Sequence, residues 1–248
     1  MDERLDSRIR LRRVGSLIPS PNTIIEREFN RILPKHYQLH VGRLRMGPID
    51  EAGWRMQDAD IEYQAELLGA ARVELIILAQ TSVSFFAPQY DSEVKARIGK
   101  ASGARAMTGG EITGEAMNAL GLRRIAFLSP YGDALNALGR KYYESRYGVA
   151  VAAMETFGRP KTSGDIDALT TDAATDTMAR LDGPEIDGFL VAGGNFSTMH
   201  AIADWERRFG KPVVTTNQSA MWATFRALGG GETLPGYGRL LAMQGSKA

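Results

Sequence analysis

Gln80, Thr81 and Ser82 form a polar cluster directly after the apolar segment at residues 74–79, which we expect to be a buried strand. Hydroxyl groups and unpaired backbone N–H groups at a strand-to-helix turn attract a carboxylate or a developing oxyanion, because the donors and the helix dipole both favour negative charge. Thr81 and Ser82 supply donors of both kinds. The cluster therefore predicts an anion-binding turn, which would stabilise an enolate or enediolate during a reaction.

Three other turns between an apolar segment and an expected helix carry related chemistry. Asn22 and Tyr131 can donate hydrogen bonds to a carboxylate, and a glycine lets the backbone approach a ligand closely. Asp133 is a candidate general base, and its alternative role is to cap the helix that follows. Because small polar residues are common helix caps, the occurrence of several such turns indicates a site more strongly than any one of them. The candidate site residues in these three turns are Asn22, Tyr131, Asp133, Gly193, Gly194 and Asn195.

Strands and helices alternate along the chain and must position these turns. Thr23 and Glu26 have the spacing of a capping box at the start of the first expected helix. The alternation predicts the α/β class, with parallel sheets that carry helices on both faces. We expect strands at residues 14–18, 37–44, 74–79, 124–128, 149–155, 187–192 and 212–216. We expect helices at residues 23–33, 59–70, 91–99, 113–120, 134–147, 170–181, 198–209 and 219–228.

The chain also repeats this plan internally. RRVGSLIPSPN matches RRIAFLSPYGD, and VELIILAQTS matches IDGFLVAGGN. The period is too long for a solenoid and predicts two pseudo-symmetric, Rossmann-like lobes, the first at residues 1–119 with 217–248 and the second at residues 120–216. Ligands of parallel sheets bind beyond the carboxyl ends of the strands, so the polar turns should meet in the cleft between the lobes.

The composition and net charge limit the classes of binding partner that we expect for this protein. With 30 basic and 29 acidic side chains the formal net charge is +1, so we expect no binding of nucleic acid or of a membrane surface. No segment reaches the roughly 18 apolar residues of a membrane span. We expect a cytoplasmic protein that binds a small molecule, and self-association into a homo-oligomer stays open. Cysteine is absent, which excludes disulfides and thiol nucleophiles.

Motifs for cofactors and metals are weak. The GGN segment is not a dinucleotide-binding fingerprint and no P-loop sequence is present, so no cofactor is expected. The three histidines are too scattered in the sequence to predict a metal site. GPIDEAGW, at residues 47–54, is expected to be a loop and a candidate lid over the cleft, whereas GRPKTSGDID, at residues 158–167, is expected to be a solvated loop.

Five stretches spread over the sequence form a recognisable set: IPSPNT, QTSVSF, LGLRRIAFLSPYGDALN, DGFLVAGGN and ERRFGKPVVTTNQSAMW. Together they resemble the aspartate/glutamate racemase superfamily, in the branch that contains maleate cis-trans isomerase and arylmalonate decarboxylase. They follow the order and spacing of that family and cover essentially the whole chain. The resemblance implies two lobes with a cofactor-free site between them. By position it implies that Thr81, Ser82 and Tyr131 bind the carboxylate or dioxyanion, assisted by Asn22 and the Gly194 backbone.

One departure from the family concerns the reaction itself. The family uses one or two cysteines at the ends of two strands, and those positions hold Gln80 and Gly193 in this chain. A thiol can move a proton at carbon or add to a double bond, whereas an amide does not titrate and glycine has no side chain. Thiol-dependent racemisation and cis-trans isomerisation therefore do not transfer to this chain by position.

Two classes of function stay open. The first is a cofactor-independent enzyme of the decarboxylase, isomerase or lyase type that acts on a small carboxylic acid through an enediolate-stabilising pocket. Decarboxylation fits best, because a proton is needed only late and can come from water or Tyr131; a hydrolase that uses a water held by Gln80 is a variant. The second class is a protein with the racemase fold that binds a carboxylate without turnover.

Overall fold

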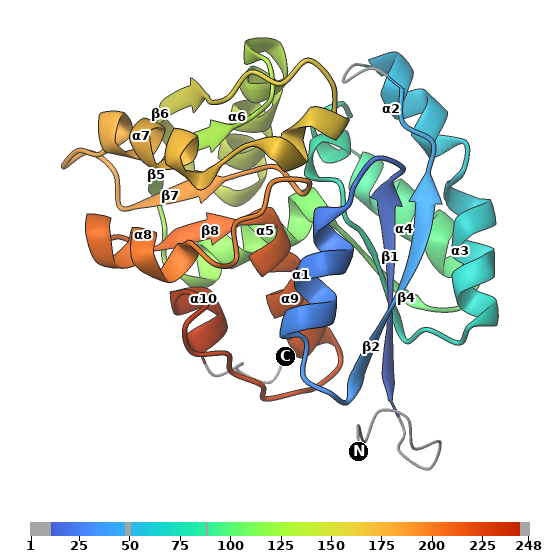
Figure 1. Ribbon diagram of the computed structural model, residues 1–248. Coiled ribbons are helices and arrows are strands. Elements are labelled where there is room, and N and C mark those ends of the chain that lie inside the picture. Colours follow the sequence, from blue (N-terminus) through green and yellow to red (C-terminus); the bar gives the residue numbers. More distant parts are fainter. Residues whose placement is uncertain (1–10, 48–50, 88, 244–248) are drawn as a thin grey trace.

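Two parallel β-sheets, one in each of two α/β lobes, form the frame of the computed structural model (Figure 1), which describes residues 11–47, 51–87 and 89–243. The strands are β1 (Arg12–Pro19), β2 (Tyr37–Leu44), β3 (Leu75–Leu78), β4 (Arg105–Thr108), β5 (Arg124–Ser129), β6 (Ala150–Thr156), β7 (Gly188–Val191) and β8 (Val213–Thr215). The first sheet has the order β2-β1-β3-β4 and the second the order β6-β5-β7-β8, and all observed pairings are parallel. The two sheets thus repeat one plan, which confirms the predicted α/β fold.

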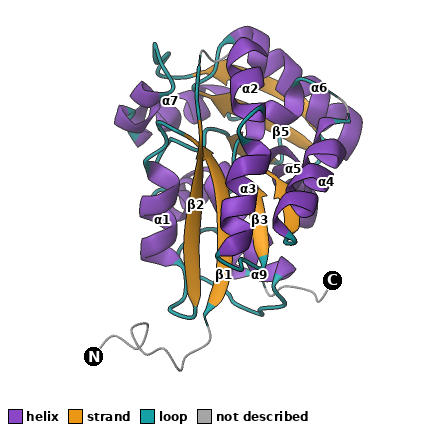
Figure 2. Ribbon diagram, turned by 90° about the vertical axis from the view of Figure 1, so that its right-hand side faces the viewer, coloured by secondary structure: helices purple, strands orange, loops and turns teal. Residues whose placement is uncertain are grey.

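Helices cover both sheets. Figure 2, viewed from the side of α3 and α4, shows these two helices in front of the first sheet, whereas α1 and α9 lie between the two lobes in Figure 1. No helix among the described residues is long and apolar enough to cross a membrane. The helices are α1 (Ile24–Ile32), α2 (Glu51–Asp58), α3 (Ile61–Ala70), α4 (Tyr90–Ser102), α5 (Gly109–Ala119), α6 (Asp133–Tyr147), α7 (Thr171–Leu181), α8 (Ile202–Phe209), α9 (Thr216–Ala227) and α10 (Arg239–Ala242), with the 3₁₀ helices η2 (Thr81–Phe85) and η3 (Gly164–Ala168).

The strand β3 is held in place by apolar packing on both faces of its sheet. Its four residues are all buried, and successive side chains point to opposite faces of the sheet. Leu75 and Ile77 pack into a central core that runs through both lobes, whereas Ile76 and Leu78 pack in a second cluster against α3 and α4. Because one apolar core joins the lobes, the turns at their facing strand ends are held in a fixed relation.

Several expectations about the elements are wrong. The strand β4 was not predicted, because its sequence, RAMT, has no apolar run and begins with an exposed Arg105. Residues 48–50 of the expected lid lie outside the described part of the chain, and residues 51–54 are not a loop but the first half of α2. Here Trp54, which stacks on Phe86 with ring centroids 5.7 Å apart, anchors a helix despite the neighbouring glycine.

Three helix starts and one loop also differ from the prediction. The helices α5 and α9 begin earlier than expected, at Gly109 and Thr216, whereas α8 begins later, at Ile202. The segment at residues 158–167 is not simply solvated: it runs into η3, where Ile166 is buried. A single apolar residue in a polar segment was too weak a signal for that contact. The lobe boundaries at residues 119 and 217 stay a prediction.

The helices α3 and α4 cross very closely at Gly69. A Cβ atom at Gly69 would lie 2.5 Å from the backbone oxygen of Ser102, whereas a Cβ atom at Gly99, also half-buried in a helix, would meet only the Ala104 oxygen at 3.6 Å. We therefore expect Gly69→Ala to lower the free energy of unfolding by about 1–3 kcal/mol through overpacking. The matched Gly99→Ala should raise it by up to about 1 kcal/mol, because alanine is the better helix former. Urea unfolding of the two variants measures the difference, and equal stabilities would contradict the crossing.

Candidate functional site

A small cavity lies at the carboxyl ends of the central strands of both sheets. The centres of water molecules can occupy about 40 Å³ of it. This space is enough for about three waters or for a small carboxylate group. Residues that follow β1, β3, β5 and β7 all contribute, as expected for ligand sites of parallel sheets. The lining residues are Pro19, Pro21, Asn22, Met46, Ala79, Gln80, Thr81, Ser82, Tyr131, Ser163, Ile166, Gly194 and Asn195.

The turn after β3 brings hydroxyl groups into the cavity. Thr81 and Ser82 open η2, which has no side-chain cap, and both residues are buried. The Thr81 hydroxyl donates to Thr216 Oγ1 at 3.4 Å, whereas Ser82 Oγ has no hydrogen-bond partner within the described residues. Phe85 holds the turn from behind by packing on Tyr142, with ring centroids 5.4 Å apart. Ser82 is therefore a donor available to a ligand.

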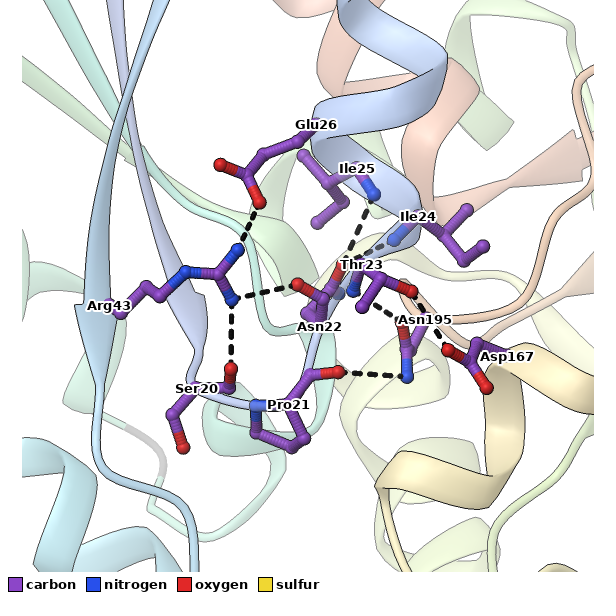
Figure 3. Close-up of polar contacts among 10 residues, drawn as sticks. All are labelled: Ser20, Pro21, Asn22, Thr23, Ile24, Ile25, Glu26, Arg43, Asp167 and Asn195. Atoms are coloured by element: carbon purple, nitrogen blue, oxygen red, sulfur yellow. Dashed lines mark hydrogen bonds and ion pairs between the residues drawn. The ribbon is translucent and has the colours of Figure 1, made fainter.

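Asn22 is fixed by the start of α1 (Figure 3). Its Oδ1 accepts hydrogen bonds from the backbone N–H groups of Ile24 and Ile25, both at 3.1 Å. Asn22 thus caps the helix, and the predicted capping box of Thr23 with Glu26 is wrong, because Thr23 makes no capping bond. Since Oδ1 faces the helix, Nδ2 of Asn22 is left without a partner in the described part of the chain.

Arg43, on β2, stiffens the same turn. Its guanidinium donates to the backbone oxygens of Ser20, at 2.8 Å, and of Asn22, at 2.9 Å, and also pairs with Glu26 (Figure 3). Hydrogen bonds from a charged donor to carbonyl oxygens are stronger than neutral ones. The cation therefore holds the backbone of the turn and is not among the residues that line the cavity.

The side chain of Asn195 joins three backbone segments. Its Oδ1 accepts from the backbone N–H of Thr23 at 2.9 Å, and its Nδ2 donates to the oxygen of Pro21 at 3.5 Å (Figure 3). The same Nδ2 donates to the backbone oxygen of Ser163 at 3.0 Å. These contacts hold the segment before η3 against the turn of Asn22. Both amide hydrogens of Asn195 are engaged, so its predicted role in substrate binding would fall to its backbone N–H.

Tyr131 contributes a phenol from the second lobe. Burial raises the pKa of Tyr131 well above its usual value of about 10, so the phenol stays protonated at neutral pH. Its Oη has no hydrogen-bond partner among the residues that the structure describes. The backbone is fixed, because Ser129 Oγ accepts from the Tyr131 N–H at 3.0 Å and Thr156 Oγ1 donates to its carbonyl oxygen at 2.8 Å.

The described lining of the cavity consists of neutral groups. As far as the chain is described, its lining contains no carboxylate, amine, imidazole or guanidinium group, and Tyr131 is the one lining residue that titrates. Asn22 Nδ2, Ser82 Oγ and Tyr131 Oη offer three donors without partners. The described residues contain no group of three or more metal-ligating side chains. This arrangement suits an anion with several oxygens.

Two predicted site residues lie outside the cavity lining. Asp133 is exposed, and its Oδ1 lies 3.1 Å from Thr156 Oγ1, whose one hydroxyl hydrogen it shares with the Tyr131 carbonyl oxygen. Gly132, not Asp133, is the N-cap of α6, so the capping alternative is wrong, and the general-base role stays a prediction without support from this geometry. Gly193 is buried behind the cavity wall, and its N–H donates to Thr216 Oγ1 at 3.2 Å.

Sequence reasoning missed three lining residues, of which only Met46 had a usable signal. Met46 follows the end of β2, so the rule that predicted the other turns also applied to it. Ser163 and Ile166 belong to the segment expected to be solvated. A second cavity, of about 700 Å³, shares Pro21, Met46 and Ser163 with the first and extends past Lys161. The inner cavity therefore adjoins a roomier space that could hold a substituent of the ligand.

Fold and site together define a two-lobed α/β protein with a cavity of neutral hydrogen-bond donors between its lobes. The family model described as arylmalonate decarboxylase matches residues 14–241. The chain belongs to the arylmalonate decarboxylase family.

Named relatives of this chain have two activities. It is 26% identical over 237 residues to the arylmalonate decarboxylase of Bordetella bronchiseptica, which covers 92% of this chain and 95% of the relative. It is 25% identical over 249 residues to a maleate isomerase of Pseudomonas putida, which covers 94% and 98%. The maleate cis-trans isomerase of Nocardia farcinica, solved as a cysteine-to-serine variant with a covalently bound succinylcysteine intermediate, has the same fold, with a TM-score of 0.85 at 22% identity over 94% of this chain and 98% of that one.

Gly193 has a backbone conformation that residues with a side chain rarely adopt. Its φ is 125°, and a Cβ atom there would lie 3.1 Å from the Pro130 ring, whereas a Cβ atom at Gly194 would make ordinary contacts at 3.5 Å or more. We expect Gly193→Ala to destabilise the protein by about 1–3 kcal/mol through backbone strain, and Gly194→Ala to change stability much less. Chemical denaturation of the matched pair checks this. A Gly193→Ala variant as stable as the wild type would show that the position accepts a side chain.

Proposed function

We propose that this protein is a cofactor-independent decarboxylase of a small malonate-type acid, in which two carboxylates share one carbon. The observation that carries the proposal is the composition of the cavity. It unites neutral hydrogen-bond donors, and among the described residues its lining contains neither a thiol nor a side chain that titrates near neutral pH. Family membership and the relative named arylmalonate decarboxylase support the same reaction.

Decarboxylation needs no base, because the substrate supplies its own electron pair. The bond between the central carbon and the leaving carboxylate breaks, CO₂ departs, and the pair stays on the substrate as an enediolate. Its charge lies on the two oxygens of the remaining carboxylate, where Ser82 Oγ and Asn22 Nδ2 can stabilise it, joined by the Thr81 hydroxyl once it turns away from Thr216. Donors that bind developing charge more strongly than the ground state lower the barrier, and each contributes about a 10²–10³-fold acceleration.

A proton must then reach the central carbon. Tyr131 Oη or a water in the cavity is the donor, and solvent reprotonates the phenol afterwards. Because burial raises the pKa of Tyr131, the phenol carries its proton at every pH at which the protein would work. The larger adjoining cavity has room for a substituent on the central carbon.

Isomerisation through a thiol adduct is not open to this chain. The Nocardia farcinica relative carries a succinylcysteine intermediate, whereas this sequence contains no cysteine. Gln80 stands where the family resemblance places one of the thiols, and its amide nitrogen is directed toward Met46 Sδ at 4.0 Å. An amide can position a water but cannot add to a double bond. A proposal of cis-trans isomerisation would need another nucleophile.

Carboxylate binding without turnover is the second candidate. The observation that favours it is again the lack of a titrating side chain other than the buried Tyr131 among the lining residues. The two candidates differ in product: a binder would be stabilised by small carboxylates and would leave them unchanged.

Loss of donors from the cavity should slow CO₂ release. We expect Ser82→Ala and Tyr131→Phe each to lower kcat on a responsive malonate by about 10²-fold, because each removes one donor from the developing charge. A panel of 2-substituted malonates and maleate, followed by mass spectrometry, identifies the substrate. Tyr63→Phe, which removes an exposed phenol on α3, is the matched control and should keep the wild-type rate. Wild-type rates in both cavity variants would contradict the proposed site.

The rate should depend little on pH. Burial raises the pKa of Tyr131 above its usual value, so its donor is present at all lower pH and is lost only far on the alkaline side. Because the described lining holds no other titrating group, kcat is expected to stay constant from about pH 6 to pH 9 for a substrate that remains ionised. Steady-state rates across this range test it. A step in kcat near pH 7 would reveal a side-chain base that the cavity does not contain.

A further inference from the structure

A buried carboxylate outside the cavity connects the two lobes. Glu28, on α1, is 5% exposed, and all its hydrogen-bond partners are neutral. Its Oε1 accepts from the backbone N–H groups of Thr198, at 2.9 Å, and Met199, at 3.1 Å, and from Ser197 Oγ at 3.1 Å. Its Oε2 accepts from Asn217 Nδ2 at 2.7 Å. Because a carboxylate only accepts hydrogen bonds, each of these partners must direct an N–H or O–H group toward Glu28.

The charge of Glu28 determines which way the amide of Asn217 faces. A carboxylate only accepts hydrogen bonds, so Asn217 must turn its Nδ2 toward Glu28. The second N–H of that nitrogen donates to the backbone oxygen of Gly194 at 3.2 Å. Asn217 Oδ1 is left buried without a partner among the described residues. Such an unsatisfied acceptor is unfavourable, so the bond to the charged oxygen is what keeps the amide in this orientation.

The held carbonyl belongs to a peptide that lines the cavity. The described chain contains no cis peptide bond, so the N–H of Asn195 points to the side opposite the Gly194 oxygen. Gly194 and Asn195 both line the cavity, and the N–H of Asn195 has no hydrogen-bond partner within the described residues. A flip of this peptide would exchange a donor for a carbonyl oxygen, which repels an anion.

We propose that Glu28 is a positioning residue: through Asn217 it fixes the peptide between Gly194 and Asn195 so that the Asn195 N–H serves as a donor to the carboxylate of the substrate. The role rests on the proposed function and adds a backbone donor to the side-chain donors of the cavity. Glu28 acts over two hydrogen bonds and does not touch the substrate.

Glu28→Gln tests the first of these two hydrogen bonds, the one between Glu28 and Asn217. The new amide nitrogen would face Asn217 Nδ2, donor against donor, so the Asn217 amide must turn and Gly194 loses its hydrogen bond. The variant keeps an oxygen for Thr198 and Met199, and we expect it to fold. We expect kcat to fall at least about 10-fold, because the donor to the developing charge is misplaced, while KM changes little.

The double variant Glu28→Gln with Asn217→Asp separates positioning from packing. It reverses the pair, so that an amide donates to a carboxylate and the number of buried charges is unchanged. Stability should therefore return toward the wild type. The rate should stay low, because a carboxylate at position 217 cannot donate to Gly194. Recovery of stability and rate together would overturn the proposal and leave Glu28 a purely structural residue.

A binding measurement keeps this test independent of turnover. In two-dimensional ¹H–¹⁵N spectra of the full chain titrated with malonate, we expect the amide signal of Asn195 to shift in the wild type and to stay in place in Glu28→Gln. If the wild type turns over no acid, the proposed decarboxylase function fails, and this shift still decides the role of Glu28. An Asn195 amide that does not respond to malonate at the highest soluble concentration in the wild type overturns the inference.

Discussion

The site depends on a fixed backbone that directs neutral hydrogen-bond donors toward the cavity. Asn22 Nδ2, Ser82 Oγ and Tyr131 Oη make no hydrogen bond within the described residues, and none of them is a buried atom without a partner, so the cavity exposes them. The apolar core that runs through both lobes supplies the rigidity, and the duplicated sheets bring equivalent strand ends face to face. Arg43 and Asn195 then tie the turns together by hydrogen bonds to backbone atoms. In the proposed function, a ligand with several anionic oxygens would accept hydrogen bonds from these donors.

The described lining of the cavity has no charged side chain, and this determines which state of the substrate it can stabilise. A cationic side chain would bind carboxylates in the ground state as tightly as in the transition state, which lowers KM without raising kcat. Neutral donors at fixed positions favour the state in which charge has moved onto the oxygens they face. Where the family places a thiol, Gly193 has a conformation that suits only glycine, and Gln80 does not titrate. Both positions agree with a reaction that starts without a base.

The fold and the position of the cavity could be predicted from the sequence, whereas the hydrogen bonds between distant segments could not. The repeat and the rule about strand ends placed Thr81 and Tyr131 at one cavity, because both depend on local patterns. The roles of Asn195 and Glu28 depend on partners more than 150 residues away, at Thr23 and Thr198, and no local pattern contains that information. The prediction of a capping box was wrong for the same reason, because the Thr23 hydroxyl donates to Asp167, which is also far away in the sequence.

Carbon-labelled substrate in heavy water tests the central claim most directly. The wild-type protein is incubated in D₂O with 2-substituted malonates that carry ¹³C in both carboxylates, and the products are followed by NMR. Base-independent decarboxylation predicts one labelled CO₂ and one deuterium at the central carbon for each product molecule. Deuterium exchange at the central carbon of the intact malonate without any loss of CO₂ would contradict it, because that reaction requires a base that the described lining does not provide.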